Sequence, residues 1–350
     1  INGYPNDINH ILSPDGFGKN DYVKTQRPLV VITGPGPGSG KMATCLSQMY
    51  LDHEMGQTSS YAKFETFPIW NLALMHPVNM AYEAATANLN DVNMIDPYHL
   101  ESYGQSAVNY NRDVEAFPVL KKMLEKIMGE APYKSPTDMG VNMVGFCIID
   151  EEAAIEASKE EIIRRYYNSL VDYRFAKESY TSIEKIQTLM SNLDIEAEDR
   201  RVAIGARKKQ EYTGKESFAI ELEDGQIITG KKSNLFSAPA AAILNTLKKL
   251  GKIDDEILLL SPHIIEPVSN LKTKSLGEVE PSLSINEMLI ALAISATTNP
   301  LTHMAMQEIK NLKNLDAHST VILNDSEKSE LRKLGLNFTQ DAVFGDDSEY

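Results

Sequence analysis

The sequence is short of cysteine, of long apolar runs and of basic clusters. Only two cysteines occur in 350 residues, Cys45 and Cys147, and each lies in a segment that we expect to be buried. This excludes a disulfide scaffold and is typical of the reducing cytoplasm. No apolar run approaches the length of a membrane-spanning helix. The formal net charge is −15, and without clustered Lys and Arg we expect no binding to nucleic acid or to anionic membranes.

Histidines are also few, and their spacing argues against zinc chemistry. The commonest zinc protease motif is H-E-x-x-H, in which two histidines hold the metal and the glutamate activates water. His53-Glu54 is followed by Gln57 where the second histidine belongs. The G-x-S-x-G elbow of many serine hydrolases is missing as well, although a serine protease of another type stays open. We therefore expect no zinc.

The sequence does contain a glycine-rich loop between an apolar run and an amphipathic segment. The apolar run covers 29–32, and apolar residues recur at helical spacing from Met42 to Tyr50. The order strand, glycine loop, lysine, helix is typical of phosphate-binding loops, because glycines let the backbone close around an anion at a helix N-terminus. The predicted phosphate-binding residues are Gly34, Gly36, Gly38, Ser39, Gly40, Lys41 and Thr44.

This loop departs from the usual pattern G-x-x-x-x-G-K-[ST] at two positions. Pro35 stands where the first glycine belongs, and Met42 stands where a hydroxyl would bind Mg²⁺. Thr44, Ser39 or a water can replace that hydroxyl, and Thr44 is our metal candidate. The alternative is a plain turn between strand and helix, in which Lys41 is merely solvated.

Two carboxylates are candidates for organising Mg²⁺. Asp96 follows a short apolar run, but helix capping with Pro97 at the first helical position explains this residue equally well. Asp138 and Asn142 precede a predicted strand, at a junction where α/β proteins tend to place ligands. We predict that Asp96 and Asp138 are catalytic and that Asn142 contacts the cofactor.

A second group of polar side chains follows in 109–113. Asn109 and Asn111 can orient a polar ligand, and Arg112 can bind phosphate or carboxylate through its forked donors. Asp113 can instead neutralise Arg112 locally. The alternative for this region is a hydrogen-bonded loop that holds the edge of a sheet.

The periodicity predicts an α/β protein of three domains. In the first domain, strands alternate with helices, which predicts a parallel sheet; these strands are expected at 29–32, 61–67, 92–96 and 145–149. The expected divisions are a phosphate-loop-like domain over 1–149, a small helical domain over 150–212, a second α/β domain over 213–340 and an acidic tail over 341–350. The chain begins without methionine, and we expect an N-terminal part of the first domain to be missing.

The second α/β domain is predicted to start with a β-hairpin over 218–230 that turns at Asp224-Gly225. Helices are expected at 239–250, 264–274, 285–297, 301–312 and 327–334, and strands at 257–260, 320–323 and 336–339.

Six separated strings point to a family, namely GPGPGSGKMAT, YAKFETFPIWN, VNMIDPYHLESYG, VNYNRDVE, YKSPTDMGVNM and LDAHSTVIL. They resemble a bacterial family of uncharacterised proteins, the domain of unknown function 1846, over essentially the whole chain. The resemblance implies that an N-terminal part is absent here. Members have been labelled ATP-dependent peptidases, so that activity is one alternative that the resemblance implies.

The C-terminal domain is similar in outline to the cytidine-deaminase fold. Those enzymes place H-x-E at the start of the helix after the hairpin and P-C-x-x-C at the next helix, where both motifs serve a zinc site. Here Ser237 to Pro239 occupy the first region and no cysteine follows Cys147. We therefore expect this domain to be structural, or to use His263, His318 or Ser319 in another way.

The leading hypothesis from these residues is a cytoplasmic protein that binds a nucleotide, ATP or GTP, with Mg²⁺, and is an ATP-dependent enzyme. Lys41 would stabilise phosphoryl charge, and Arg112 is the further catalytic candidate. One alternative is a non-catalytic module that binds a phosphorylated small molecule. The other is a scaffold or homo-oligomer, because helical arms such as 150–212 often mediate self-association.

Overall fold

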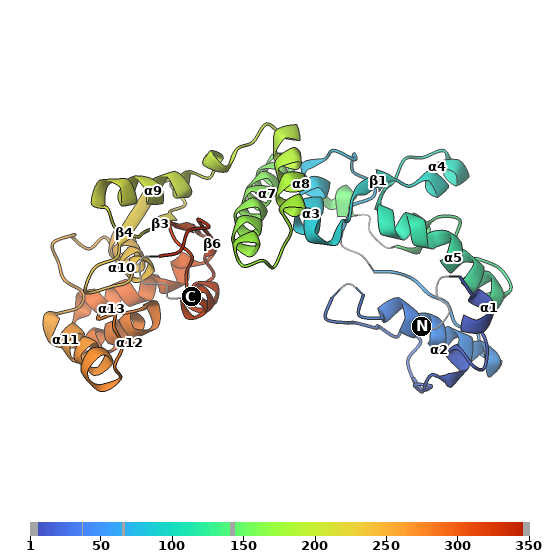
Figure 1. Ribbon diagram of the computed structural model, residues 1–350, viewed down its shortest axis with the longest axis horizontal. Coiled ribbons are helices and arrows are strands. Elements are labelled where there is room, and N and C mark those ends of the chain that lie inside the picture. Colours follow the sequence, from blue (N-terminus) through green and yellow to red (C-terminus); the bar gives the residue numbers. More distant parts are fainter. Residues whose placement is uncertain (1–5, 37, 65–66, 141–143, 346–350) are drawn as a thin grey trace. The chain divides into compact units, whose positions relative to one another are not determined.

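A computed structural model describes residues 6–36, 38–64, 67–140 and 144–345, and the chain forms two compact units (Figure 1). The N-terminal unit is Ile1–Ser158 and the C-terminal unit is Lys159–Tyr350. Helix α7 (Glu151–Arg174) contains the boundary. Helices and strands occur in both units, so the fold is mixed α/β, as the sequence predicts.

The N-terminal unit is built around helix α5 (Asn111–Met128). This helix buries Phe117, Leu120 and Leu124 at helical spacing. Helix α2 (Lys41–Glu54) adds Leu46 and Met49 to the same apolar cluster, which confirms the amphipathic helix predicted after the glycine loop. The remaining helices are α1 (Ile8–Ile11), α3 (Pro77–Ala85), α4 (Pro97–Tyr103) and α6 (Pro136–Met139).

The described part of the N-terminal unit does not form the predicted parallel sheet. Its paired strands are β1 (Asn93–Ile95) and β2 (Val108–Tyr110), and they run antiparallel. Of the strand expected at 61–67, the described residues show an isolated parallel bridge between Lys63 and Gly140.

Two further strand predictions in this unit are wrong. Leu29 and Val31 are 79% and 74% exposed and lie outside any strand. Val144–Cys147 forms a 3-10 helix, and the Cys147 side chain is exposed, not buried. An apolar run becomes a strand only where a neighbouring strand pairs its backbone N–H and C=O groups. The described residues supply no such neighbour at either segment.

The C-terminal unit is built on a four-stranded mixed sheet in the order β4-β3-β5-β6. Its strands are β3 (Ser217–Glu221), β4 (Ile227–Lys231), β5 (Asp316–Ser319) and β6 (Asn337–Gln340). β3 is antiparallel to both of its neighbours, whereas β5 and β6 are parallel. The predicted hairpin is confirmed: Gly225 at its turn has a φ of +79°, which favours glycine.

The five helices predicted after the hairpin are confirmed, with ends that shift by up to about five residues. They are α10 (Ala238–Leu250), α11 (Pro262–Asn270), α12 (Ile285–Ala296), α13 (Pro300–Gln307) and α14 (Asp325–Leu334). The helical segment before the hairpin also contains α8 (Tyr180–Asn192) and α9 (Arg201–Thr213).

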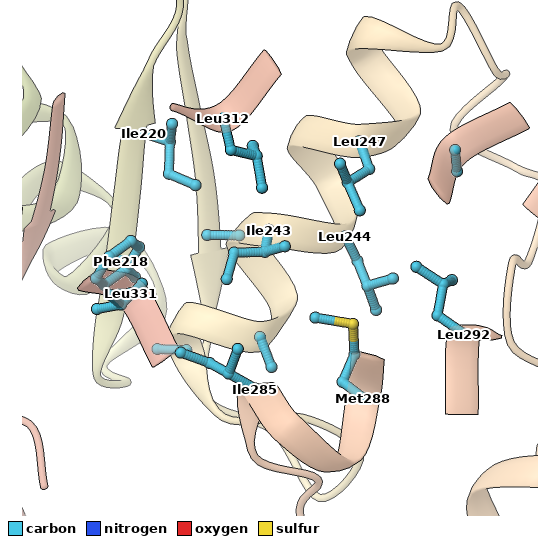
Figure 2. Packing of buried hydrophobic residues seen from close by; sticks show 14 of the residues in the cluster. Phe218, Ile220, Ile243, Leu244, Leu247, Ile285, Met288, Leu292, Leu312 and Leu331 are labelled. Carbon is cyan, nitrogen blue, oxygen red and sulfur yellow. The ribbon is translucent and has the colours of Figure 1, made fainter. Parts of the chain in front are cut away.

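Alternate residues of β3 face two different helix layers. Phe218 and Ile220 belong to the large core formed with α10 and α12, which Figure 2 shows from close by. Ala219, between them, packs with Val202 and Ala206 of α9. Because successive side chains of a strand point to opposite faces, α9 covers one face of the sheet and α10 covers the other. Thus α9, which the sequence assigns to a separate helical domain, lies on this sheet.

The strand predicted at 257–260 is also wrong, because this segment is a loop without strand pairing. Leu259 and Leu260 are 4% and 5% exposed and pack into the core. The hydroxyls of Ser295 and Thr302 donate to the carbonyl of Leu259 at 3.0 and 2.9 Å. These side chains thereby take the place of a partner strand. The helices that the structure describes include none with the length and apolar character needed to cross a bilayer.

Candidate functional site in the glycine loop

The glycine loop, described at residues 34–36 and 38–40, leads into α2 with Gly40 as the N-cap. A Cβ atom at Gly34 would lie 2.4 Å from Ser39 Oγ and 3.2 Å from Lys41 Cγ, so only glycine fits there without a shift. Gly38 and Gly40 have φ angles of +72° and +88°, in the left-handed region that glycine adopts readily. Gly34, Gly38 and Gly40 are therefore favoured by this backbone, whereas a Cβ atom at Gly36 would meet no atom within 4 Å.

The side chain of Lys41 lies across the loop. Its Nζ donates to the carbonyl of Gly36 at 2.8 Å and to Ser39 Oγ at 3.2 Å. The phosphate hypothesis requires this ammonium group to face the loop, and these two hydrogen bonds hold it there. Both contacts are made to neutral oxygens, so the positive charge of Lys41 has no carboxylate partner among the described residues.

The start of α2 presents backbone N–H groups without side-chain caps. Gly40 is the N-cap and supplies no side chain, and the first turn contains no acidic residue. In the described structure the N–H groups of Lys41, Met42 and Ala43 have no hydrogen-bond partner, and the first helical bond is Thr44 N to Gly40 O at 2.9 Å. Such a helix end carries uncompensated partial positive charge, which favours an anion.

Asp96 serves as the N-cap of α4. It is fully buried, and its Oδ1 accepts from the N–H groups of Tyr98 and His99 at 2.9 and 3.1 Å. Its Oδ2 accepts from the N–H and the hydroxyl of Thr137 at 3.2 and 2.6 Å. With four donors on two oxygens, Asp96 fits the capping alternative that the sequence left open, and it has little capacity left for a metal.

Asp138 forms a capping box with Ser135 at the start of α6. Its Oδ2 accepts from the N–H groups of Lys134 and Ser135 and from the hydroxyl of Tyr103, at 3.0, 3.1 and 2.9 Å. The bond to Asp138 raises the pKa of Tyr103. Its Oδ1 lies 3.6 Å from His99 Nδ1. Asp138 is thus committed to local structure, as Asp96 is.

The predicted asparagines also bond to protein groups. Asn109 donates to Thr137 Oγ1 at 3.3 Å and is 4% exposed. Asn111 accepts from Val92 N–H at 3.0 Å and donates to Asn90 O at 3.3 Å. Asn142 lies outside the described residues.

Arg112 has a partner that the sequence did not suggest. Its Nε and Nη2 lie 2.6 and 2.7 Å from the two carboxylate oxygens of Asp91, which is 1% exposed. The bond to Asp91 raises the pKa of Arg112. Asp113, the expected local partner, pairs with Lys63 instead. The suggestion that Asp113 neutralises Arg112 is therefore wrong.

Thr137 on α6 brings Asp96 and Asn109 together, because its hydroxyl donates to Asp96 and accepts from Asn109. Asp138 follows in the same short helix. Within the described residues, no hydrogen bond or ion pair joins this group to Lys41 or to the glycine loop. The described residues therefore show no direct contact that links the phosphate-loop candidates to the carboxylate candidates.

Sequence reasoning missed a polar network around a buried arginine in the C-terminal unit. Arg200, 2% exposed, pairs with Glu160 and Asp316 at 2.9 Å each and donates to Thr339 Oγ1 at 2.9 Å. Burial raises the pKa of Glu160. The network borders a cavity of about 170 Å³ lined by Glu160, Asp199, Arg200, Arg201, Val202, Glu221 and Asp316.

His318 lies in the same network and is fully buried. Its Nδ1 is 2.8 Å from Thr339 Oγ1 and its Nε2 is 3.3 Å from Asp341 Oδ1. Arg207 also pairs with Asp341 at 2.6 Å. Asp341 is therefore bound to the unit, although the sequence places it in the acidic tail. Burial lowers the pKa of His318, and the charges of Arg207 and Arg200 add to this effect against that of Asp341.

Lowering the pH is expected to destabilise the C-terminal unit through His318. Its folded pKa lies below the unfolded value of about 6.5, so the unfolded state binds more protons once the pH falls below that value. The stability present above about pH 6.5 should decline by at most about 1.4 kcal/mol per pH unit for this one proton. Urea unfolding between about pH 8 and 5 measures the slope.

His318→Gln should flatten this slope, because it removes the titrating group. The control His303→Gln changes an exposed histidine and should keep the slope of the natural sequence. Equal slopes in all three proteins would contradict the assignment.

Comparison with known proteins finds matches along both parts of the chain. Residues 1–194 match the family described as domain of unknown function DUF1846, N-terminal, and residues 198–350 match the corresponding C-terminal family. The whole chain is 58% identical to UPF0371 proteins of Streptococcus uberis and Streptococcus thermophilus, and it covers 71% of each. A UPF0371 protein of Streptococcus pneumoniae is similar at the same identity and coverage.

Proposed function

This chain belongs to the DUF1846 family, and we propose that its glycine loop binds the phosphate groups of a nucleotide such as ATP or GTP. The observation that carries the proposal is the position of Lys41 Nζ, 2.8 Å from Gly36 O and 3.2 Å from Ser39 Oγ, beside the unpaired amides of the α2 N-terminus. A phosphate oxygen can replace these two neutral acceptors and bond to the same ammonium group. It would also meet the backbone donors that glycine leaves accessible.

Charge supports an anion at this position. The first turn of α2 has no acidic residue, and Lys41 has no carboxylate partner in the described structure. The bonds that Lys41 already makes have a charged donor and neutral acceptors. A phosphate oxygen would supply a charged acceptor as well, and the attraction between opposite charges would strengthen the contact.

The loop is compatible with two functions. One is an enzyme that uses ATP, and the other is a module that holds a phosphorylated small molecule. The module is the second candidate, and the position of the carboxylates favours it. Asp96 and Asp138 cap α4 and α6, so neither is free to serve as a base or a metal ligand. Phosphate release from ATP separates the two candidates, since the enzyme releases phosphate and the module does not.

Lys41→Ala is expected to abolish stabilisation by ATP. A ligand at about one hundred times its Kd stabilises the folded state by about 2.7 kcal/mol, which raises the melting temperature of the natural sequence by several degrees. Without the ammonium group the shift should disappear. Thermal unfolding with and without Mg-ATP measures it.

The matched control is Lys19→Ala, which removes an exposed lysine paired with Asp15 and should keep the shift. An equal ATP shift in Lys41→Ala would refute the loop as the site. No shift in the natural sequence with any nucleotide would favour the scaffold alternative, in which the loop is a plain turn.

A further inference from the structure

We infer that the glycine loop takes phosphate groups as the free anion, without Mg²⁺. The inference rests on the proposed function and concerns how the same site neutralises phosphate charge. It rests on the side chains that could bind Mg²⁺ at the loop.

The first position that could supply a Mg²⁺ ligand is the residue directly after the lysine. In phosphate loops with the usual pattern, a Ser or Thr hydroxyl at this position binds Mg²⁺. Here it is Met42, whose side chain is partly buried against the apolar cluster of α2 and α5. Mg²⁺ takes oxygen ligands in near-octahedral geometry, so a thioether that packs in a core supplies nothing to it.

Thr44 is the next hydroxyl along α2. Its Oγ1 donates to the carbonyl of Gly40 at 3.1 Å, four residues back in the helix. The same carbonyl accepts the first helical N–H bond, from Thr44 N at 2.9 Å. This side chain is held against its own helix backbone, an arrangement common for threonine. Its hydroxyl thus lies three positions beyond Lys41 and is turned towards the backbone of its own helix, unlike a hydroxyl directly after the lysine.

Carboxylates are the third kind of possible Mg²⁺ ligand. Asp96 accepts four hydrogen bonds, and Asp138 accepts three on one oxygen. The residues present do not fit Mg²⁺ at the loop.

The positive charge available to a phosphate is then the ammonium of Lys41 together with the amides of the loop and of α2. One lysine and a helix N-terminus, equivalent to about half a charge, match one phosphate group better than a triphosphate. A phosphate monoester, or the terminal phosphate of a nucleotide, is the chemical class that this site fits.

Calorimetric titration of the full chain with ATP, in excess Mg²⁺ and in excess EDTA, tests the inference. We expect Kd values that agree within about threefold, and titration with inorganic phosphate in EDTA should give saturable binding. A loss of about tenfold or more in EDTA, about 1.4 kcal/mol, would overturn the inference and leave the proposed function intact. Absence of ATP binding in both buffers would overturn the proposed function itself, and this inference with it.

Met42→Thr restores the missing hydroxyl and gives a second measurement. We expect Mg²⁺ to strengthen ATP binding to this variant by about tenfold, whereas the control Met42→Leu should stay indifferent to Mg²⁺. A Mg²⁺ effect of about tenfold in Met42→Leu or in the natural sequence would overturn the inference, because a loop without the hydroxyl would then bind the metal.

Discussion

Replacement of Arg200 by alanine is expected to cost the C-terminal unit about 3 kcal/mol of stability, at the lower end of the range for breaking a buried ion pair. Arg200 is 2% exposed, and its guanidinium joins three segments. It pairs with Glu160 and Asp316 at 2.9 Å, and Nη2 donates to the carbonyl of Asn337 at 2.7 Å. Alanine leaves these acceptors without their donor and opens a void beside Thr339.

The lower end of the range applies because both acids can be rehydrated. The side chains of Glu160 and Asp316 are 42% and 38% exposed, so water can replace part of the lost interaction. The buried hydroxyl of Thr339, which accepts from Arg200 Nε at 2.9 Å, has no such access. Most of the cost should therefore arise from the buried acceptors and the void.

Equilibrium unfolding in urea measures the loss, and Arg201→Ala is its control. Arg201 is the next residue on α9, but its side chain is 63% exposed, so the change should stay within about 0.5 kcal/mol. Arg200→Met, which keeps the stem volume, should recover part of the loss. A loss below about 1 kcal/mol in Arg200→Ala would mean that the network does not hold α9 to β5 and β6.

The sequence was a good guide to helices and a poor guide to the strands of the N-terminal unit. Leu46 and Met49 reveal the buried face of α2, because a helix satisfies its own backbone and needs only an apolar stripe to pack. A strand depends on a partner elsewhere in the chain. The apolar runs at 29–32 and 145–149 have strand composition but no partner in the described structure, and composition alone cannot show this.

In the candidate site, too, local backbone features could be predicted from the sequence, whereas contacts between residues far apart in the chain could not. Glycine spacing predicted the loop around Lys41, because left-handed backbone is a local property. Asp96 was ambiguous because an N-cap and a metal ligand after a short strand have the same sequence context. Arg112 and Asp91 are 21 positions apart, and no pattern in the sequence indicates that they form an ion pair. Arg200 sits in a charged helical segment where an exposed position is the ordinary expectation.

Gly230→Ala is the second change for which we expect a large effect. Gly230 lies on β4 opposite Phe218, where α10 crosses the sheet. A Cβ atom there would lie 2.1 Å from the backbone nitrogen of Ala242 and 2.7 Å from the carbonyl carbon of Ala241. Backbone atoms of a helix cannot move singly, so α10 as a whole would have to shift away from the strand.

Such a shift would loosen the packing of Ile243 and Leu247 in the core cluster that also contains Phe218 and Ile220 (Figure 2). Overpacking costs typically about 1–3 kcal/mol and more where the neighbour cannot yield. We expect about 3 kcal/mol or more for Gly230→Ala, measured by urea or thermal unfolding.

Gly205→Ala is the matched control, because it adds the same methyl group on the other face of the sheet. There the new Cβ would meet Ile227 Cγ2 at 2.6 Å, a side-chain methyl group and not a backbone atom. The helix gains up to about 1 kcal/mol from the replacement of glycine by alanine, which offsets part of the cost of moving Ile227, so this variant should lose clearly less stability than Gly230→Ala. If Gly230→Ala were equally well tolerated, β4 and α10 could not be in the close contact that only a glycine at position 230 allows.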